Sequence, residues 1–199
     1  MAFEEAFFKT MEHEGCYSNS KKDRGGETYK GISRRYHPKW PGWRIIDEAK
    51  EKFGGIDALK KCDVIPVLGQ RAQRVLEALV KEFYKIHFWD AINATAISVV
   101  APRVAEYAFD AQVNPTDRTN GAKLLQEALN EFGAKLKVDG KIGPLTLKAL
   151  GEVVEDYGED MLLDTMKKLR AIHYAKEVRR NPAQTVHLVG WLKRALEIA

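Results

Sequence analysis

The sequence predicts a mainly α-helical fold with at most a small β-hairpin near residues 15–33. Apolar residues recur at intervals of three and four along most of the 199-residue chain, which is the spacing of one helix face. Strict alternation of apolar and polar residues, typical of half-buried strands, is scarce. No tandem repeat or low-complexity linker interrupts the chain, so we expect one integrated unit.

The N-terminal part is predicted to be a short amphipathic helix followed by a loop. The helix ends at Glu14-Gly15, and four apolar residues occupy one of its faces: Phe3, Ala6, Phe7 and Met11. Residues 15–31 are rich in Gly, Ser, Asn and Lys, which predicts a long loop or a small hairpin. In residues 31–42 basic and aromatic side chains are interleaved with two prolines, so any helix there is broken.

Longer helices are expected in the rest of the chain. Residues 69–93 predict an amphipathic helix with a buried stripe of Val75, Leu79, Phe83 and Ile86. Residues 99–112 are apolar almost throughout, which predicts a buried central helix around which the rest packs. Further helices are predicted at residues 121–132, from 145–150 onward, at 161–179 and at 186–198, with a turn at 138–144.

Composition restricts the functional class. Lys and Arg number 32 against 28 Asp and Glu, and both signs are interspersed along the chain. The net charge of +4 suits an anionic polymer, but no segment concentrates enough basic residues to predict nucleic-acid binding. The two cysteines, Cys16 and Cys62, form no metal-binding spacing. We interpret them as two unpaired thiols of a protein that folds in a reducing compartment.

The N-terminus predicts synthesis in the cytoplasm without a signal peptide. Its first residues, Met1-Ala2-Phe3-Glu4-Glu5, are acidic where a signal peptide would be basic, and no long apolar run follows. Charge interrupts every apolar stretch well before it reaches about 18 residues, so we expect no stable membrane insertion. A target outside the cytoplasm would therefore require another component to release the protein.

Glu14 is a candidate general acid for hydrolysis of a glycosidic bond. Such a reaction needs a carboxylic acid that is still protonated near neutral pH and a second group that holds or activates water. The end of the helix dipole and the neighbouring apolar side chains favour the protonated form of Glu14. Asp23 follows nine positions later and Thr28 five positions after that, as candidates to bind the attacking water. Spacing alone leaves open that Glu14 is a solvated surface residue.

A family resemblance covers nearly the whole chain. The string His13-Glu14-Gly15-Cys16-Tyr17, followed by Asp23, Gly25-Gly26, Thr28 and Gly31-Ile32-Ser33, resembles the N-terminal signature of glycoside hydrolase family 108. The resemblance continues in Phe88-Trp89-Asp90, in Phe109-Asp110 with Val113-Asn114, and in Gly190-Trp191 with Arg194. It implies an N-acetylmuramidase with a lysozyme-like fold of two lobes, residues 1–95 and 96–199, integrated into one compact unit with the glycan between them. The catalytic Glu of the family falls on Glu14.

The motif departs from the expected patterns at two positions. The order Glu14, Asp23, Thr28 is similar to the triad of bacteriophage lysozymes, but Thr28 arrives one position earlier than in that triad. Cys16 replaces the second Gly of the usual Glu-Gly-Gly-Tyr. A nucleophilic Cys16 assisted by His13 is an alternative, although nothing in the sequence requires thiolate chemistry.

Residues 121–150 resemble the core of a predicted peptidoglycan-binding domain. The segment predicts a helix, a tight turn that needs Gly140 and Gly143, and a second helix with Pro144 at its first position. A purely structural helical hairpin is the alternative. If the resemblance holds, this region and Glu14 point to the same polymer.

Four further residues are predicted to contact substrate. Tyr17 and Tyr29 flank the proposed catalytic loop, where their rings would stack on sugars. Asp110 and Asn114 lie one turn apart on the apolar helix. Both are polar where burial is expected, so they either contact substrate or cross-link helices.

These observations predict a peptidoglycan hydrolase that cleaves between N-acetylmuramic acid and N-acetylglucosamine, with no metal or organic cofactor. Glu14 would act as the general acid, assisted by Asp23 and Thr28. The rivals are a lytic transglycosylase and a non-catalytic protein that binds the wall or assists secretion. Either way the protein would act on the wall in the periplasm after release, with a holin or a secretion apparatus as its partner.

Overall fold

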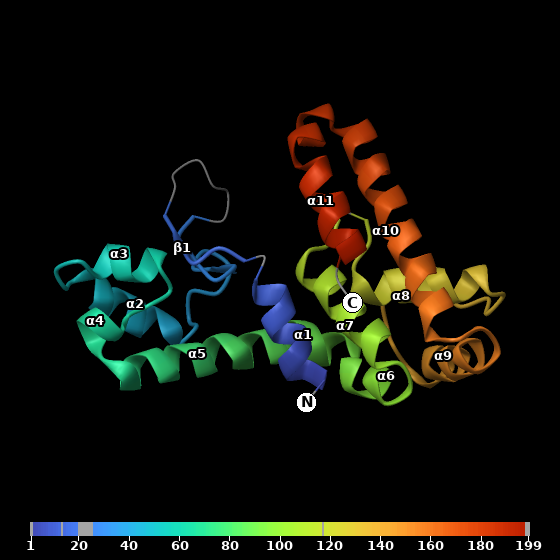
Figure 1. The fold of residues 1–199 in the computed structure, drawn as a ribbon, viewed down its shortest axis with the longest axis horizontal. Coiled ribbons are helices and arrows are strands. Elements are labelled where there is room, and N and C mark those ends of the chain that lie inside the picture. Colours follow the sequence, from blue (N-terminus) through green and yellow to red (C-terminus); the bar gives the residue numbers. More distant parts are fainter. Residues whose placement is uncertain (1, 13, 20–25, 117, 198–199) are drawn as a thin grey trace. The chain divides into compact units, whose positions relative to one another are not determined.

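The computed structural model describes residues 2–12, 14–19, 26–116 and 118–197 and is mainly α-helical (Figure 1). The β structure within these ranges is one three-stranded antiparallel sheet near the N-terminus. The predicted fold class is therefore confirmed. Within the same ranges, no helix combines the length and the apolar character that a membrane span requires.

The chain divides into two compact units whose boundaries are not the ends of helices. One unit is Thr10–Lys85, and the other joins Met1–Lys9 to Ile86–Ala199. The N-terminal helix α1 (Ala2–Met11) thus contributes residues to both units. The lobes expected from the sequence, 1–95 and 96–199, stay a prediction.

The unit Thr10–Lys85 begins with a sheet of strand order β1-β2-β3. Its strands are β1 (Tyr17–Ser18), β2 (Thr28–Tyr29) and β3 (Ile32–Ser33). In register, Tyr29 lies between Tyr17 and Ile32, and Thr28 lies between Ser18 and Ser33. The small hairpin expected near residues 15–33 is therefore present as β2 and β3, with β1 paired beside it.

Three short helices follow the sheet: α2 (Gly42–Lys50), α3 (Gly55–Lys60) and α4 (Ile65–Leu68). The sequence reasoning missed them because each is shorter than the window in which helical periodicity is recognisable. At the start of α2, Trp40 packs edge-on against Trp43, with ring centroids 5.2 Å apart. A Cβ at Gly42 would lie 2.2 Å from the Trp40 ring. Glycine is therefore required for this packing.

Helix α5 (Gln70–Tyr84) confirms a helix in this region but presents a different face from the predicted one. The predicted stripe is wrong, because Val75 is 45% and Ile86 is 53% exposed. The buried side chains of α5 are those of Gln73, Leu76, Val80, Phe83 and Tyr84. Both stripes have helical spacing and share one aromatic residue, so periodicity alone cannot separate them.

The buried amide of Gln73 explains which face turns inward. It accepts a hydrogen bond from the N–H of Val64 at 2.9 Å and donates one to the carbonyl of Cys62 at 3.1 Å. A buried amide that makes these hydrogen bonds stabilises the fold. The same amide packed against apolar groups would lack hydrogen-bond partners and would destabilise the fold. After α5 the chain continues as a π-helical turn (Lys85–Trp89) and a 3-10 turn (Asp90–Ile92), so the predicted helix does not continue unbroken to residue 93.

Cys16 and Cys62 form a disulfide, with Cα atoms 5.3 Å apart. The interpretation as two unpaired thiols is therefore wrong. The cysteines are 46 positions apart in sequence, and no local spacing signals that they meet. The fold brings them together because α3 packs beside β1. The bond joins the segment that follows Glu14 to the turn between α3 and α4.

Removal of this disulfide should destabilise the protein substantially. Closing a loop of 46 residues restricts the unfolded chain by an amount equivalent to about 4 kcal/mol. We therefore expect the double substitution Cys16→Ser with Cys62→Ser to lower the free energy of unfolding in urea by about that amount. Reductant should lower the stability of the wild-type protein similarly and leave the double variant unchanged. A wild-type protein insensitive to reductant would contradict the prediction.

The other unit is built around helix α7 (Pro102–Val113), in which every residue from Val104 to Ala111 is buried. The buried central helix is therefore confirmed, although it begins at Pro102, because Val99 belongs to the preceding helix α6 (Ala94–Val100) and is exposed. On one side of α7, Phe109 meets Phe3 and Trp89 edge-on, with ring centroids 5.9 and 5.7 Å apart. This aromatic cluster attaches the first residues of the chain to the unit.

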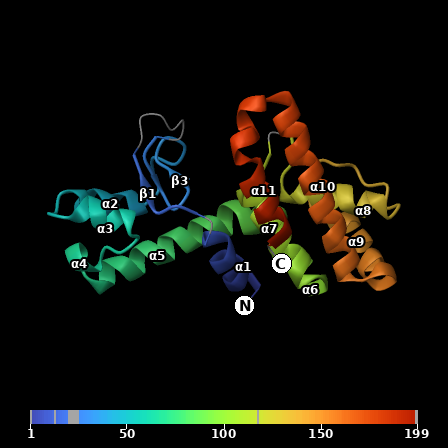
Figure 2. The same cartoon turned by 45° about the horizontal axis from the view of Figure 1, so that its top comes forward.

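The remaining helices of this unit are α8 (Gly121–Glu131), α9 (Pro144–Tyr157), α10 (Glu159–Arg180) and α11 (Thr185–Glu197). All four lie where the sequence predicts helices, and Pro144 is at the start of α9 as expected. Between α8 and α9, the buried amide of Gln126 accepts from the N–H of Gly140 and donates to the carbonyl of Lys141. Helices α10 and α11 form an antiparallel hairpin (Figure 2).

Candidate active site

Glu14 lies in a pocket of about 240 Å³ in the unit Thr10–Lys85. Its backbone N–H still bonds to the carbonyl of Met11 at 3.2 Å, so the end of α1 positions the residue. The pocket is lined by Glu14, Gly15, Cys16, Tyr17, Ser18, Thr28 and Gly31. Among these residues, Glu14 carries the one carboxyl group, and its side chain is partly buried.

Gly31, which lines the pocket, belongs to the two-residue turn between β2 and β3. Lys30 and Gly31 both have positive φ, 44° and 75°, as the tightest type of β-hairpin turn requires. A Cβ built on Gly31 would lie 3.1 Å from Oε2 of Glu14. The absence of a side chain at Gly31 therefore leaves room for the carboxyl group of Glu14.

Thr28 and Tyr17 reach the pocket from the sheet. Thr28 is partly buried on β2, and Tyr17 lies on the neighbouring strand β1. The structure thus brings together Glu14, Thr28 and Tyr17, three of the residues selected from the sequence. Asp23, the other predicted catalytic residue, lies outside the described residues.

Glu27 orients Tyr17, and the sequence reasoning missed it. Its carboxylate accepts a hydrogen bond from the Tyr17 hydroxyl at 3.0 Å and lies 2.8 Å from both Nζ of Lys50 and Nε of Arg34. Burial and the neighbouring Glu27 raise the pKa of Tyr17. The sequence offered one signal for Glu27, which is its position immediately before Thr28 in the motif. Because the Tyr17 hydroxyl is engaged by Glu27, the ring rather than the hydroxyl is available to a sugar.

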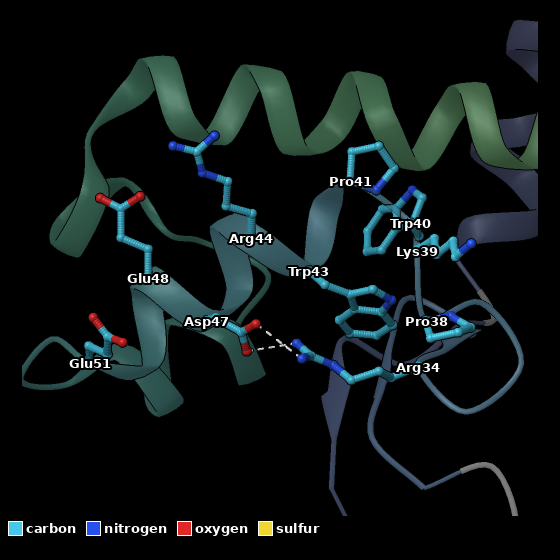
Figure 3. A pocket seen from close by; sticks show the side chains of 10 residues that line it. All are labelled: Arg34, Pro38, Lys39, Trp40, Pro41, Trp43, Arg44, Asp47, Glu48 and Glu51. Carbon is cyan, nitrogen blue, oxygen red and sulfur yellow. Dashed lines mark hydrogen bonds and ion pairs between the residues drawn. The ribbon is translucent and has the colours of Figure 1, made fainter.

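A second, larger depression of about 590 Å³ lies on the same unit (Figure 3). Arg34 stacks 4.5 Å from the ring centroid of Trp43 and binds Asp47 through two hydrogen bonds of 3.0 and 2.7 Å. The hydrogen bonds from Arg34 hold the pKa of Asp47 below its ordinary value. Trp40 and Trp43 are buried, and their N–H groups donate to backbone carbonyls.

The larger depression is a less suitable catalytic site than the pocket around Glu14. Its indoles are buried, Asp47 is paired with Arg34, and its other carboxylates, Glu48 and Glu51, are exposed. A general acid needs a carboxyl group held at a defined place beside the substrate. We therefore assign the candidate site to the smaller pocket, where Glu14 rests on a constrained turn.

Tyr29 and Asp110 lie in protein interiors rather than in this pocket. Tyr29 is 1% exposed, and burial raises its pKa to about 12. Asp110 is fully buried on α7 in the other unit. Its carboxylate accepts hydrogen bonds from Arg170 at 2.8 Å and from Arg194 at 3.0 and 2.7 Å.

This geometry gives Asp110 the cross-linking role that the sequence left open, because the two arginines come from α10 and α11. Burial alone would lower the pKa of Arg170, but the charge of Asp110 raises it above its ordinary value. Asn114, partly buried at the end of α7, donates to the Tyr174 hydroxyl at 3.4 Å. Both residues belong to a different unit from Glu14.

Comparisons with known proteins match two successive regions of the chain. A sequence model of the family described as glycosyl hydrolase 108 matches residues 7–115, which include Glu14. A model described as a predicted peptidoglycan domain matches residues 120–196, a longer region than the 121–150 segment recognised in the sequence. The two matches meet at the loop between α7 and α8. No curated protein matches the sequence.

The structure of SagA from Brucella abortus has a similar fold. The two chains are 18% identical, the match covers 98% of this chain and 94% of SagA, and the TM-score is 0.55. At this level of identity the likeness concerns the fold alone. The family match, in contrast, spans more than half of the sequence and contains the proposed catalytic motif. The chain therefore belongs to glycosyl hydrolase family 108.

Proposed function

We propose that the protein is an N-acetylmuramidase that hydrolyses peptidoglycan between N-acetylmuramic acid and N-acetylglucosamine. The observation that carries this proposal is the position of Glu14, which is held against Gly31 in a pocket with Thr28 and Tyr17. The glycosyl hydrolase match around this site and the predicted peptidoglycan domain at residues 120–196 support the choice of polymer.

In the proposed reaction Glu14 is the general acid. Its carboxyl proton passes to the glycosidic oxygen as the bond from that oxygen to the anomeric carbon breaks. A water molecule adds to the anomeric carbon and loses its proton to a base, for which Asp23 is the candidate. The Thr28 hydroxyl, in the same pocket as Glu14, would hold that water. If the carboxyl groups of Glu14 and Asp23 are about 6.5–9.5 Å apart, the reaction should invert the configuration of the anomeric carbon. A distance of about 5–5.5 Å would predict that the configuration is retained.

The proposed substrate, peptidoglycan, indicates where in the cell the protein would act. We propose that the protein acts on the wall in the periplasm and reaches it with the help of a holin or a secretion apparatus. The disulfide between Cys16 and Cys62 supports an oxidising place of action, because such bonds persist outside the reducing cytosol. The glycan contact predicted for Asn114 would lie in the unit that carries the predicted peptidoglycan domain.

The masses and reducing ends of released fragments test the proposal. We expect purified peptidoglycan, digested and then reduced with borohydride, to yield fragments that end in reduced muramic acid. A lytic transglycosylase would instead release anhydro sugars, which lack one water relative to the hydrolysis product and have no end that borohydride can reduce. A glucosaminidase would leave reduced N-acetylglucosamine. Wall binding without any fragment release would show that the protein is a non-catalytic wall-binding protein and would refute the proposal.

A further inference from the structure

Tyr84, the last residue of α5, is a buried aromatic residue that contacts the turn beneath Glu14. Its hydroxyl donates a hydrogen bond to the carbonyl of Lys30 at 2.8 Å. The two residues are 54 positions apart, so no sequence motif links them. The side chain is 2% exposed, and a buried hydroxyl with a defined acceptor holds that acceptor in place.

A second hydrogen bond also holds the turn. The N–H of Lys30 donates to the carbonyl of Cys16 at 2.6 Å, and Cys16 is itself fixed by the disulfide to Cys62. Lys30 adopts a φ of 44°, a conformation that is unfavourable for a residue with a Cβ. Such a conformation persists where surrounding contacts enforce it. Here those contacts come from Cys16 and Tyr84.

The carboxyl of Glu14 and the hydroxyl of Tyr84 lie on the same side of Gly31. A Cβ on Gly31 would be 2.5 Å from the hydroxyl oxygen of Tyr84 and 3.1 Å from Oε2 of Glu14. The missing side chain thus creates a small space that these two groups share. Any movement of the turn would change the surface on which the Glu14 carboxyl rests.

We propose that Tyr84 is a positioning residue for Glu14, which acts by holding the Lys30–Gly31 turn against the Glu14 carboxyl group. This inference rests on the proposed function for its catalytic consequence. In this role the hydroxyl of Tyr84 acts through its hydrogen bond to the backbone carbonyl of Lys30. Its effect is on geometry, and displacement of a catalytic group by about 1 Å is sufficient to reduce the rate of a reaction by about 10²-fold.

The test is Tyr84→Phe, which removes one oxygen and keeps the ring in the core. With soluble glycan fragments as substrate, we expect kcat to fall about tenfold while KM stays within about twofold. The matched control is Tyr36→Phe, because Tyr36 belongs to the same unit and is 66% exposed. It should leave both constants unchanged. Equal kcat for the two variants would overturn the proposal.

Two measurements that need no activity accompany the kinetics. Amide hydrogen exchange at Lys30 and Gly31 should become about three- to tenfold faster in Tyr84→Phe, because one hydrogen bond that closes the turn is lost. The carboxyl carbon resonance of Glu14, identified by its absence in Glu14→Gln, should shift in Tyr84→Phe and not in Tyr36→Phe. If the wild-type protein releases no fragments, the proposed function fails, and these spectra still decide whether Tyr84 positions Glu14. Unchanged spectra would refute it.

A double-mutant cycle with Gly31→Ala tests the shared space directly. The new methyl group would meet the Tyr84 hydroxyl oxygen, which is the nearest atom to its position. Gly31→Ala should therefore lower the melting temperature more in the wild-type background than in the Tyr84→Phe background, where that oxygen is missing. Strictly additive effects would show that the two residues do not share this space and would count against the proposal.

Discussion

Glu14→Gln should lower the rate of cell-wall clearing by about 10²- to 10⁴-fold, which is the usual contribution of a general acid. Glutamine keeps the size and shape of the side chain but has no proton of carboxylic-acid strength for the glycosidic oxygen. The pocket should remain intact, because an amide fits the space beside Gly31 as well as a carboxyl does. The measurement is the decrease in turbidity of purified cell wall, at equal amounts of folded protein.

The control for this experiment is Glu48→Gln. Glu48 lies in the same unit, is exposed, and lines the larger depression beside Trp43. Its replacement should leave clearing unchanged. If Glu14→Gln clears the wall at the wild-type rate, Glu14 is not the general acid. If Glu48→Gln loses clearing, the larger depression becomes the candidate active site (Figure 3).

Asp110→Ala should destabilise the protein by about 3–5 kcal/mol, as expected when one partner of a buried ion pair is removed. The Asp110 carboxylate is bonded to Arg170 and Arg194, whose side chains are 2% and 12% exposed. Without it, the guanidinium group of Arg170, which is buried, loses the carboxylate that it bonds at 2.8 Å. The nearby Tyr174 hydroxyl accepts from Nε of Arg170 at 2.9 Å but supplies no charge.

The free energy of unfolding in urea, followed by circular dichroism, measures this effect. The matched control is Asp160→Ala, which breaks the exposed pair between Arg103 and Asp160 in the same unit. Exposed pairs contribute about 0–1 kcal/mol, so the control should retain nearly full stability. If the two variants lose equal stability, the buried cluster does not hold α7, α10 and α11 together.

The sequence was sufficient to predict features that depend on neighbouring residues. Helical periodicity predicted α8, α10 and α11 close to their observed bounds, because apolar spacing of three and four directly reflects one buried face. The almost continuous apolar character of residues 99–112 predicted α7. The motif around Glu14 identified the family that the comparison shows. It also identified Glu14 and Thr28 as site residues, and both line one pocket. This was possible because the residues that line the pocket lie within 18 positions of one another in the sequence.

The tertiary structure alone decided the features that join distant segments. The pairing of Cys16 with Cys62, the inward face of α5 at Gln73 and the contact of Tyr84 with Lys30 each depend on packing. So does the meeting of Asp110 with Arg170 and Arg194. A local pattern shows which side of a helix is apolar. It does not show which element packs against that side, nor which group a buried polar side chain bonds. That choice is made when the elements pack and every buried polar group must find a bond.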